Sequence, residues 1–389
     1  MQSGHFSNIG SGMNDREFML EALCLARRGE GTTRPNPPVG AVVVKNGMII
    51  GRGFHRKAGE PHAEILALAA AGEAARGSSL YVTLEPCSTR GRTPPCTDAI
   101  IAAGVRKVVY AATDPNPVNR GRAARILRQA GIAVASGVCE EEASELLAPF
   151  RKWVEKKVPF LTLKLGMTID GRIADGAGAS RWITSPQSRE MVRALRRRVD
   201  AVMVGAGTVR ADDPSLVSAG DARGRLWRVI VDGRGEADPC WRVFADDFAG
   251  QTILATVRSR AERRLAECSR KGARVWILPS AGGGRVRLKA LLRRLGRFGI
   301  LHVLCEGGGR LAYEIARQGL ADRYVFFIAP RLLGGGRSIP AFNGPGWRLN
   351  RMPRLRFLSV ERTGEDILVT AETESGMAQR RGGSRSEGC

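Results

Sequence analysis

The chain has 389 residues, 43% hydrophobic and 25% charged, which is ordinary for a soluble globular protein and long enough for two domains. No run approaches the roughly 18 apolar residues that span a bilayer, and the start of the chain lacks the basic and apolar segments of a signal peptide. The eight cysteines show no disulfide framework. We therefore expect a cytoplasmic protein with no membrane partner.

The formal net charge of +23 is unevenly distributed. Residues 1–155 carry 19 basic and 15 acidic side chains, whereas the remainder carries 42 and 23. A first half that gripped a polynucleotide would need a basic surface, so its near balance predicts no nucleic-acid partner. Most of the excess arginines are expected to be solvated, with a few left to bind phosphate.

The first half alternates predicted helices and strands. A helix over 15–28 precedes a hairpin of strands 41–44 and 48–51, whose Asn46-Gly47 turn is a strong hairpin signal. The later expected elements are helix 63–71, strand 80–84, helix 97–103, strand 107–112, helix 121–130 and strand 133–136. This order predicts an α/β layer of helices packed on a sheet, ending near residue 150.

A second α/β unit follows the charged connection 151–157. Its expected strands are 158–165, 201–204, 228–232, 252–256, 274–278, 300–305, 323–328 and 366–371, and its expected helices include the very basic 193–198, 288–295 and 309–318. The predicted domain bounds are 1–13 for a flexible extension, 14–155, 156–373, and 374–389 for a disordered basic tail.

Two short runs predict a catalytic zinc site. His62-Ala63-Glu64 supplies one imidazole, and Cys87 and Cys96 supply two thiolates, so three protein ligands leave one coordination position open. Zinc-dependent nucleobase deaminases carry the same signature, in which a glutamate that does not bind the metal moves protons. Glu64 is therefore the predicted proton shuttle. The two cysteines are separated by a longer loop than in the usual signature, in which two residues lie between them.

Two other interpretations of these residues remain open. An editing deaminase of nucleic acid or free bases, fused to a separate nucleotide-binding domain, shares the signature but predicts a basic zinc domain with stacking aromatics. A structural zinc protein normally supplies four ligands, and only His55 is near enough in sequence to add one.

Two glycine-rich runs in the second half point to a ligand. Residues 204–214 follow a predicted strand, and residues 305–311 join a strand to a helix, where backbone N–H groups can approach a phosphate. Neither run matches the dinucleotide fingerprint of Rossmann domains, so that fold is disfavoured.

The motifs PHAE, TLEPCS, GRTPPC, DPNP, LKLGMTIDGR, WITS, ADDP and CEGGG occur in this order over roughly residues 14–372. Together they resemble the bifunctional riboflavin-biosynthesis deaminase/reductase family. The resemblance implies a cytidine-deaminase-like α/β/α domain followed by a dihydrofolate-reductase-like α/β domain, one Zn²⁺ per chain, NADPH, a phosphorylated pyrimidine substrate and a homo-oligomer.

The resemblance also assigns binding residues. The positions implied for substrate are Asn36, His55, Arg92, Lys164, Ser180, Arg196, Leu216 and Glu306. Those implied for the cofactor are Gly166, Trp182, Thr208, Asp212, Gly308, Gly309, Arg310, Leu311, Ala312, Tyr313 and Glu314. Asp170 matches a motif residue beside the cofactor.

The chain departs from the family pattern at two positions. Thr89 stands where the family has a histidine, and Ala219 stands where it has an arginine that a loop shift could replace with Arg223 or Arg225. For the 2′-phosphate of NADPH, Arg210 is our candidate because a guanidinium suits phosphate.

Overall fold

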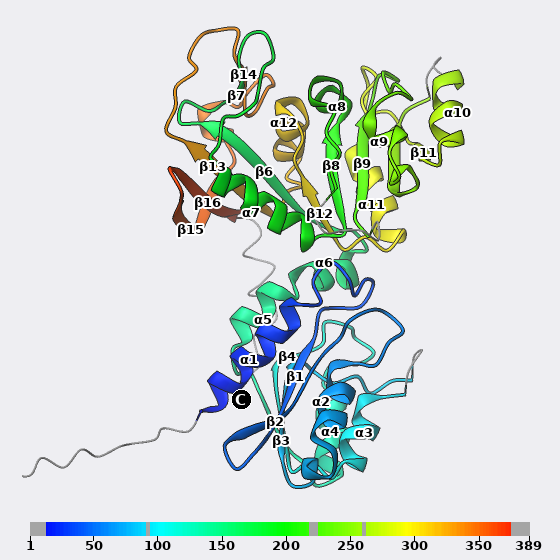
Figure 1. Cartoon of the computed structure of the whole chain (residues 1–389), viewed down its shortest axis with the longest axis vertical. Coiled ribbons are helices and arrows are strands. Elements are labelled where there is room, and N and C mark those ends of the chain that lie inside the picture. The colour runs from blue at the N-terminus through cyan, green and yellow to red at the C-terminus, as the bar shows by residue number, and fades with distance from the viewer. Residues whose placement is uncertain (1–12, 91–93, 218–224, 259–261, 375–389) are drawn as a thin grey trace, which may run out of the picture. The chain divides into compact units, whose positions relative to one another are not determined.

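The computed structural model describes residues 13–90, 94–217, 225–258 and 262–374 (Figure 1). The chain divides between Lys156 and Lys157 into two compact units. Arg92, Ala219 and Arg223 lie outside the described residues. Within the described residues, no helix has both the length and the apolar character needed to cross a bilayer.

The first unit is a five-stranded sheet between two layers of helices. Strand order is β2-β1-β3-β4-β5, with β1 antiparallel to β2 and β3, and with β3, β4 and β5 parallel. Its elements are α1 (Asp15–Arg27), β1 (Gly40–Lys45), β2 (Met48–Phe54), α2 (Ala63–Ala71), the 3₁₀ turn Gly72–Ala75, β3 (Ser79–Leu84), α3 (Cys96–Ala102), β4 (Lys107–Ala112), α4 (Arg122–Gln129), β5 (Ala133–Ser136), α5 (Glu140–Leu146) and α6 (Ala148–Lys156).

The alternation of side chains along the strands builds two cores. Val42 and Val44 of β1 face α1 and α5, whereas Ala41 and Val43 face α2, α3 and α4. The predicted hairpin is confirmed, because Asn46 and Gly47 both adopt the positive φ that its tight turn requires.

Glycines bring α2 unusually close to the sheet. A Cβ atom at Gly51 would lie 2.2 Å from the carbonyl oxygen of Ala67, and one at Gly53 would lie 2.3 Å from that of Ala63. The face of α2 that meets β2 is therefore packed backbone against backbone. This contact fixes the depth of the helix whose first turn carries Glu64.

The second unit is a nine-stranded sheet in the order β11-β10-β9-β8-β12-β6-β13-β16-β15. All neighbours from β11 to β13 are parallel, and β16 and β15 add antiparallel strands. Its elements are β6 (Phe160–Thr168), β7 (Arg172–Ala174), α7 (Pro186–Arg197), β8 (Ala201–Gly205), α8 (Ala206–Asp212), β9 (Trp227–Asp232), α9 (Arg242–Ala245), the 3₁₀ turn Ala249–Gln251, β10 (Thr252–Thr256), α10 (Glu262–Arg270), β11 (Arg274–Ile277), α11 (Leu288–Arg297), β12 (His302–Cys305), α12 (Gly309–Arg317), β13 (Arg323–Ala329), β14 (Ile339–Pro340), the 3₁₀ turn Leu349–Arg351, β15 (Leu355–Thr363) and β16 (Asp366–Thr373).

Helices cover both faces of this sheet. Ala201 and Met203 of β8 pack in one core with α11 and α12, whereas Val202 and Val204 pack in another with α8, α9 and α10. Strand β12 returns between β8 and β6, so the chain winds outward in both directions from this point. Ligands of open α/β sheets bind at the carboxyl ends of strands beside such a reversal.

The structure corrects one element of the second unit. Residues 206–212, for which the sequence analysis predicted no helix, form the helix α8. Gly207 lowers helix propensity by about 1 kcal/mol, but the buried side chains Ala206 and Val209 anchor this helix against the sheet.

Candidate active sites

Three predicted metal ligands converge at the ends of three elements. His62 is the residue before α2, Cys96 is the first residue of α3, and Cys87 follows β3. His62 Nδ1 lies 3.2 Å from Cys96 Sγ and 3.5 Å from Cys87 Sγ. All three donor atoms lie within 4.8 Å of one another, so one ion can reach them together.

This donor set fits zinc. The hydrogen bond from the Cys96 thiol holds the pKa of Cys87 well below its ordinary value and correspondingly raises the pKa of Cys96. The backbone N–H of Cys96 also donates to Cys87 Sγ at 3.3 Å. One imidazole and two thiolates are ligands that Zn²⁺ prefers, and a divalent cation would remove the repulsion between two ionised sulfurs.

The carboxyl group of Glu64 lies beside these donors. Glu64 is in the first turn of α2 and its side chain is buried. Burial raises the pKa of this carboxyl group, and the nearby Cys87 thiolate raises it further. A buried carboxyl group whose pKa lies above its ordinary value suits general acid–base chemistry.

A cavity of about 350 Å³ opens beside the metal ligands. Asn36, His55 and Thr89 line it together with Glu64. Asn36 Nδ2 lies 3.1 Å from His55 Nε2, and His55 Nδ1 lies 3.2 Å from the carbonyl oxygen of Pro61. Burial lowers the pKa of His55, which favours a neutral ring that can exchange hydrogen bonds with a heterocycle. Thr89, which stands where the resemblance implies a histidine, is among the lining residues.

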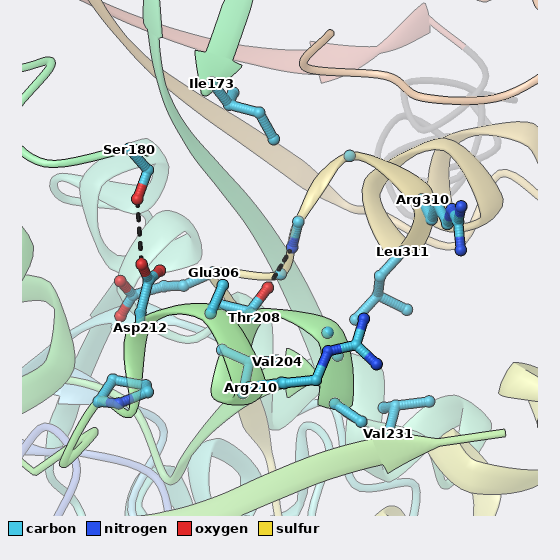
Figure 2. Close-up of a pocket in the computed structure, with 18 of the residues that line it drawn as sticks. Ile173, Ser180, Val204, Thr208, Arg210, Asp212, Val231, Glu306, Arg310 and Leu311 are labelled. Atoms are coloured by element: carbon cyan, nitrogen blue, oxygen red, sulfur yellow. Dashed lines mark hydrogen bonds between the residues drawn. The ribbon is translucent and has the colours of Figure 1, made fainter. Parts of the chain in front are cut away.

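The second unit contains a larger cavity of about 1490 Å³. It opens at the carboxyl ends of β8 and β9 and at the turn between β12 and α12 (Figure 2). Thr208 Oγ1 accepts a hydrogen bond from Gly308 N at 3.0 Å, which ties α8 to this turn. Ser180 Oγ donates to Asp212 Oδ1 at 3.1 Å on another wall.

Most of the residues that the resemblance assigns to the second domain line this cavity. They are Lys164, Gly166, Ser180, Trp182, Arg196, Thr208, Asp212, Leu216, Glu306, Gly308, Gly309, Arg310, Leu311 and Glu314. Ala312 and Tyr313 are not among its lining residues. Both are buried, Ala312 in the core beneath the sheet and Tyr313 against Trp347, because the helical period turns them inward.

A buried ion pair joins two of the lining residues. Arg196 Nε and Nη2 donate to the two oxygens of Glu306 at 2.6 and 3.0 Å, which is a bidentate contact. Burial alone would raise the pKa of Glu306, but Arg196 and then Lys164 hold it below its ordinary value. Burial also lowers the pKa of Lys164. The bidentate contact therefore fixes the orientation of the charged guanidinium group of Arg196 at the cavity wall.

Asp170 is not among the residues that line this cavity. Its carboxylate accepts hydrogen bonds from Thr168 Oγ1 and from the backbone N–H groups of Leu333 and Gly334. These contacts, led by the one from Thr168, lower the pKa of Asp170 to about 2. Asp170 thus holds the segment after β13.

Sequence reasoning missed several lining residues. Glu85, Asp114 and Phe150 line the first cavity, and Arg234 and Arg285 line the second. Asp114 begins the DPNP motif noted in the sequence, but the motif alone did not indicate what this side chain does. The two arginines follow strands in glycine-rich loops, where position alone does not separate a ligand from a solvated side chain.

Two protein-family profiles match the chain, one in each unit. The profile described as "Cytidine and deoxycytidylate deaminase zinc-binding region" matches residues 13–112, and that described as "RibD C-terminal domain" matches residues 159–369. The protein is therefore an enzyme that joins a zinc-binding deaminase domain to a reductase domain.

Relatives share both domains. "Riboflavin biosynthesis protein RibD" of Aquifex aeolicus is 43% identical over 357 residues, covering 91% of this chain and 97% of the relative. The Escherichia coli protein of the same name is 40% identical over 374 residues, covering 92% of this chain and 99% of the relative. The chain belongs to the RibD family of riboflavin biosynthesis proteins.

Solved structures agree over the same range. A diaminohydroxyphosphoribosylaminopyrimidine deaminase/5-amino-6-(5-phosphoribosylamino)uracil reductase of Thermotoga maritima has a TM-score of 0.83 and 37% identity, covering 92% of this chain and 98% of that one. RibD of Acinetobacter baumannii (form 1) has a TM-score of 0.82 and 36% identity with the same coverage. Because the similarity spans both domains, the editing-deaminase alternative is not favoured.

Proposed function

We propose that the first domain deaminates 2,5-diamino-6-(5-phosphoribosylamino)pyrimidin-4(3H)-one by hydrolysis. The second domain then uses NADPH to reduce the ribosyl group to ribityl, giving 5-amino-6-(5-phosphoribitylamino)uracil. The observation that carries this proposal is the pairing, in one chain, of a His/Cys/Cys cluster beside a buried glutamate with a second cavity large enough for cofactor and substrate. The two activities named for the Thermotoga maritima relative support the same pair of reactions.

In the deaminase site, His62, Cys87 and Cys96 would hold the zinc ion. When bound, zinc supplies Lewis-acid activation of water. Glu64 takes a proton from the attacking water and returns it to the departing ammonia, which is the usual work of a buried general acid–base. Asn36 and His55 hold the pyrimidine ring in the cavity by hydrogen bonds. Arg92 is proposed for the substrate phosphate.

In the reductase site, the cofactor supplies the hydride and the protein supplies orientation. The cavity exceeds the roughly 300–1,000 Å³ of a typical small-molecule site, which leaves room for two ligands. Gly308 and the first turn of α12 offer a helix N-terminus to a diphosphate. Arg196, held by Glu306, and Lys164 are proposed to bind the phosphorylated sugar chain.

The preference for NADPH over NADH is assigned to Arg210. Its guanidinium reaches toward Leu311 and Val231 at the cavity wall (Figure 2). Arg210 Nη1 donates to Glu236 Oε2 at 2.7 Å, and both side chains are partly exposed. A 2′-phosphate would replace Glu236 as its partner, because a doubly charged oxyanion accepts stronger hydrogen bonds than a carboxylate.

The experiment supplies the purified protein with the diamino intermediate, with and without NADPH, and follows ammonia release and NADPH oxidation. We expect ammonia in both reactions and NADPH loss only after deamination. Glu64→Gln keeps the shape of the side chain but removes the base, so ammonia release should fall by about 10²–10⁴-fold.

The same variant is its own control for the second domain. When it is supplied with substrate that has already been deaminated, Glu64→Gln should oxidise NADPH at the rate of the unmodified protein. Ammonia release at a normal rate would exclude Glu64 as the base. Absence of both reactions in the unmodified protein would contradict the proposed function.

A further inference from the structure

Of the three metal ligands, Cys87 is the one that lies outside a helix start, although Cys96 N at the start of α3 donates to its sulfur. His62 and Cys96 are fixed by the starts of α2 and α3, whereas Cys87 lies in the turn between β3 and α3. A flexible ligand would cost affinity, because its conformational freedom would be lost on binding an ion. Further contacts from outside the turn would reduce this cost.

The side chain of Asn119 spans this turn. Asn119 Oδ1 accepts hydrogen bonds from Ser88 N at 2.7 Å and from Ser88 Oγ at 2.6 Å, directly after Cys87. Asn119 Nδ2 donates to the carbonyl oxygen of Pro86 at 3.1 Å, directly before Cys87. Asn119 is only 2% exposed, so water does not compete for these bonds. The amide of Asn119 thus forms hydrogen bonds with the residues immediately before and immediately after Cys87.

Asp114 fixes which way this amide faces. Asn119 Nδ2 also donates to Asp114 Oδ2 at 3.0 Å, while Asp114 Oδ1 accepts from Asn116 N at 2.8 Å. A flipped amide would place its NH₂ group against the N–H donor of Ser88 and its oxygen against the carboxylate of Asp114. Because both contacts would then be repulsive, only one orientation is allowed. This gives the DPNP motif, which begins at Asp114, a physical role.

We propose that Asn119 is a positioning residue that holds Cys87 Sγ in place for the zinc ion, with Asp114 orienting its amide. The inference rests on the proposed zinc site and adds to it a residue outside the ligand set. Side chains that orient metal ligands in this way typically contribute 10–100-fold to metal affinity.

The test measures zinc affinity of the full-length protein by competition with a chelator of known affinity. Asn119→Ala removes the hydrogen bonds to Ser88 and Pro86. Asn119→Asp keeps the acceptor for Ser88 but places a second carboxylate against Asp114. We expect both variants to bind zinc about 10–100-fold more weakly. Asn116→Ala is the matched control, because among the described residues the hydrogen bond to its side chain comes from Val118 N in the same loop. Its zinc affinity should be unchanged.

Cobalt(II) gives a readout that a loss of stability alone would not move. The visible and thiolate charge-transfer bands of the cobalt-loaded protein depend on the angle and distance of each sulfur. These bands should shift in the Asn119 variants and stay fixed in Asn116→Ala. Ser88→Ala removes one hydrogen bond and leaves those between Asn119 and the backbone of Ser88 and Pro86. It should lower the zinc affinity by at most about 10-fold. It serves as the second variant if Asn119→Ala does not fold.

The outcomes separate this inference from the proposed function. If the unmodified protein binds zinc and the Asn119 variants match it in affinity and cobalt spectrum, Asn119 is not a positioning residue and the zinc site stands. If the unmodified protein binds no zinc, both the zinc site and this inference are overturned.

Discussion

The Arg196–Glu306 pair permits a quantitative test of electrostatics in the reductase cavity. The perturbation is Glu306→Gln, which keeps the volume of the side chain and removes its charge. Glutamine can accept from Arg196 at one atom, but its NH₂ group would face the other N–H of the guanidinium. Arg196 would then lie beside Lys164 with no compensating carboxylate.

The size of the effect follows from burial. The side chains of Arg196 and Glu306 are 19% and 10% exposed. Removing one partner of a fully buried pair costs about 3–5 kcal/mol. The residual exposure at the cavity wall lowers this to about 2–3 kcal/mol of unfolding free energy. At about 2–4 °C per kcal/mol for a domain of this size, the midpoint should fall by about 5–10 °C.

The assay is thermal unfolding of the full chain followed by tryptophan fluorescence. Five of the six tryptophans lie after residue 157, so the signal reports mainly on the reductase unit. The matched control is Glu190→Gln, also on α7, where Glu190 pairs with Arg193 and Arg197 through side chains that are 43–56% exposed. A surface pair of this kind contributes about 0–1 kcal/mol, so the control should shift by at most about 2–4 °C. Equal shifts in the two variants would refute the reasoning.

The remaining predictions concern the metal, the cofactor and acid stability. Purified protein should contain one zinc ion per chain and His62→Ala none, by metal analysis; stoichiometric zinc in that variant would exclude the ligand assignment. Arg210→Ala should raise the Kd of NADPH about 10-fold and leave that of NADH unchanged, by nucleotide fluorescence, and equal losses would exclude Arg210. The lowered pKa of Glu306 means that its stabilising contribution is present above the unfolded value of 4.5 and is lost as pH falls through the lowered value. The difference in stability between the unmodified protein and Glu306→Gln should therefore shrink as pH falls below 4.5, in urea titrations; a constant difference would contradict the assignment.

The parts of the fold that the sequence predicted are those in which pattern and local chemistry agree. The strand over 107–112 and the Asn46-Gly47 turn occur as expected, since each is specified within a few residues. Strand β15 was not anticipated, because it is an edge strand whose side chains are mostly exposed on both faces and show no alternation. Its place in the sheet depends on pairing with β16.

The sites divide in the same way. The convergence of His62, Cys87 and Cys96 could be predicted because zinc chemistry restricts both residue type and position. The ion pair of Arg196 with Glu306 could not be predicted from local sequence, since Arg193 and Arg197 on the same helix pair with an exposed glutamate instead. Arg196 differs from these two arginines because it pairs with Glu306, which is over a hundred residues away in sequence and directly follows β12. Asn119 escaped notice for the same reason.

The contact between α2 and β2 has a consequence for how this domain can vary over generations. Gly51 and Gly53 are not among the residues that line the cavity, yet any added Cβ would collide with the backbone of α2. The helix would have to move outward and take the start of α2, with Glu64, away from the sulfurs. In a saturation library selected for deamination, these two positions should accept substitutions as rarely as the metal ligands do. The absence of a Cβ atom at these two positions thus helps to set the distance between Glu64 and the sulfur atoms.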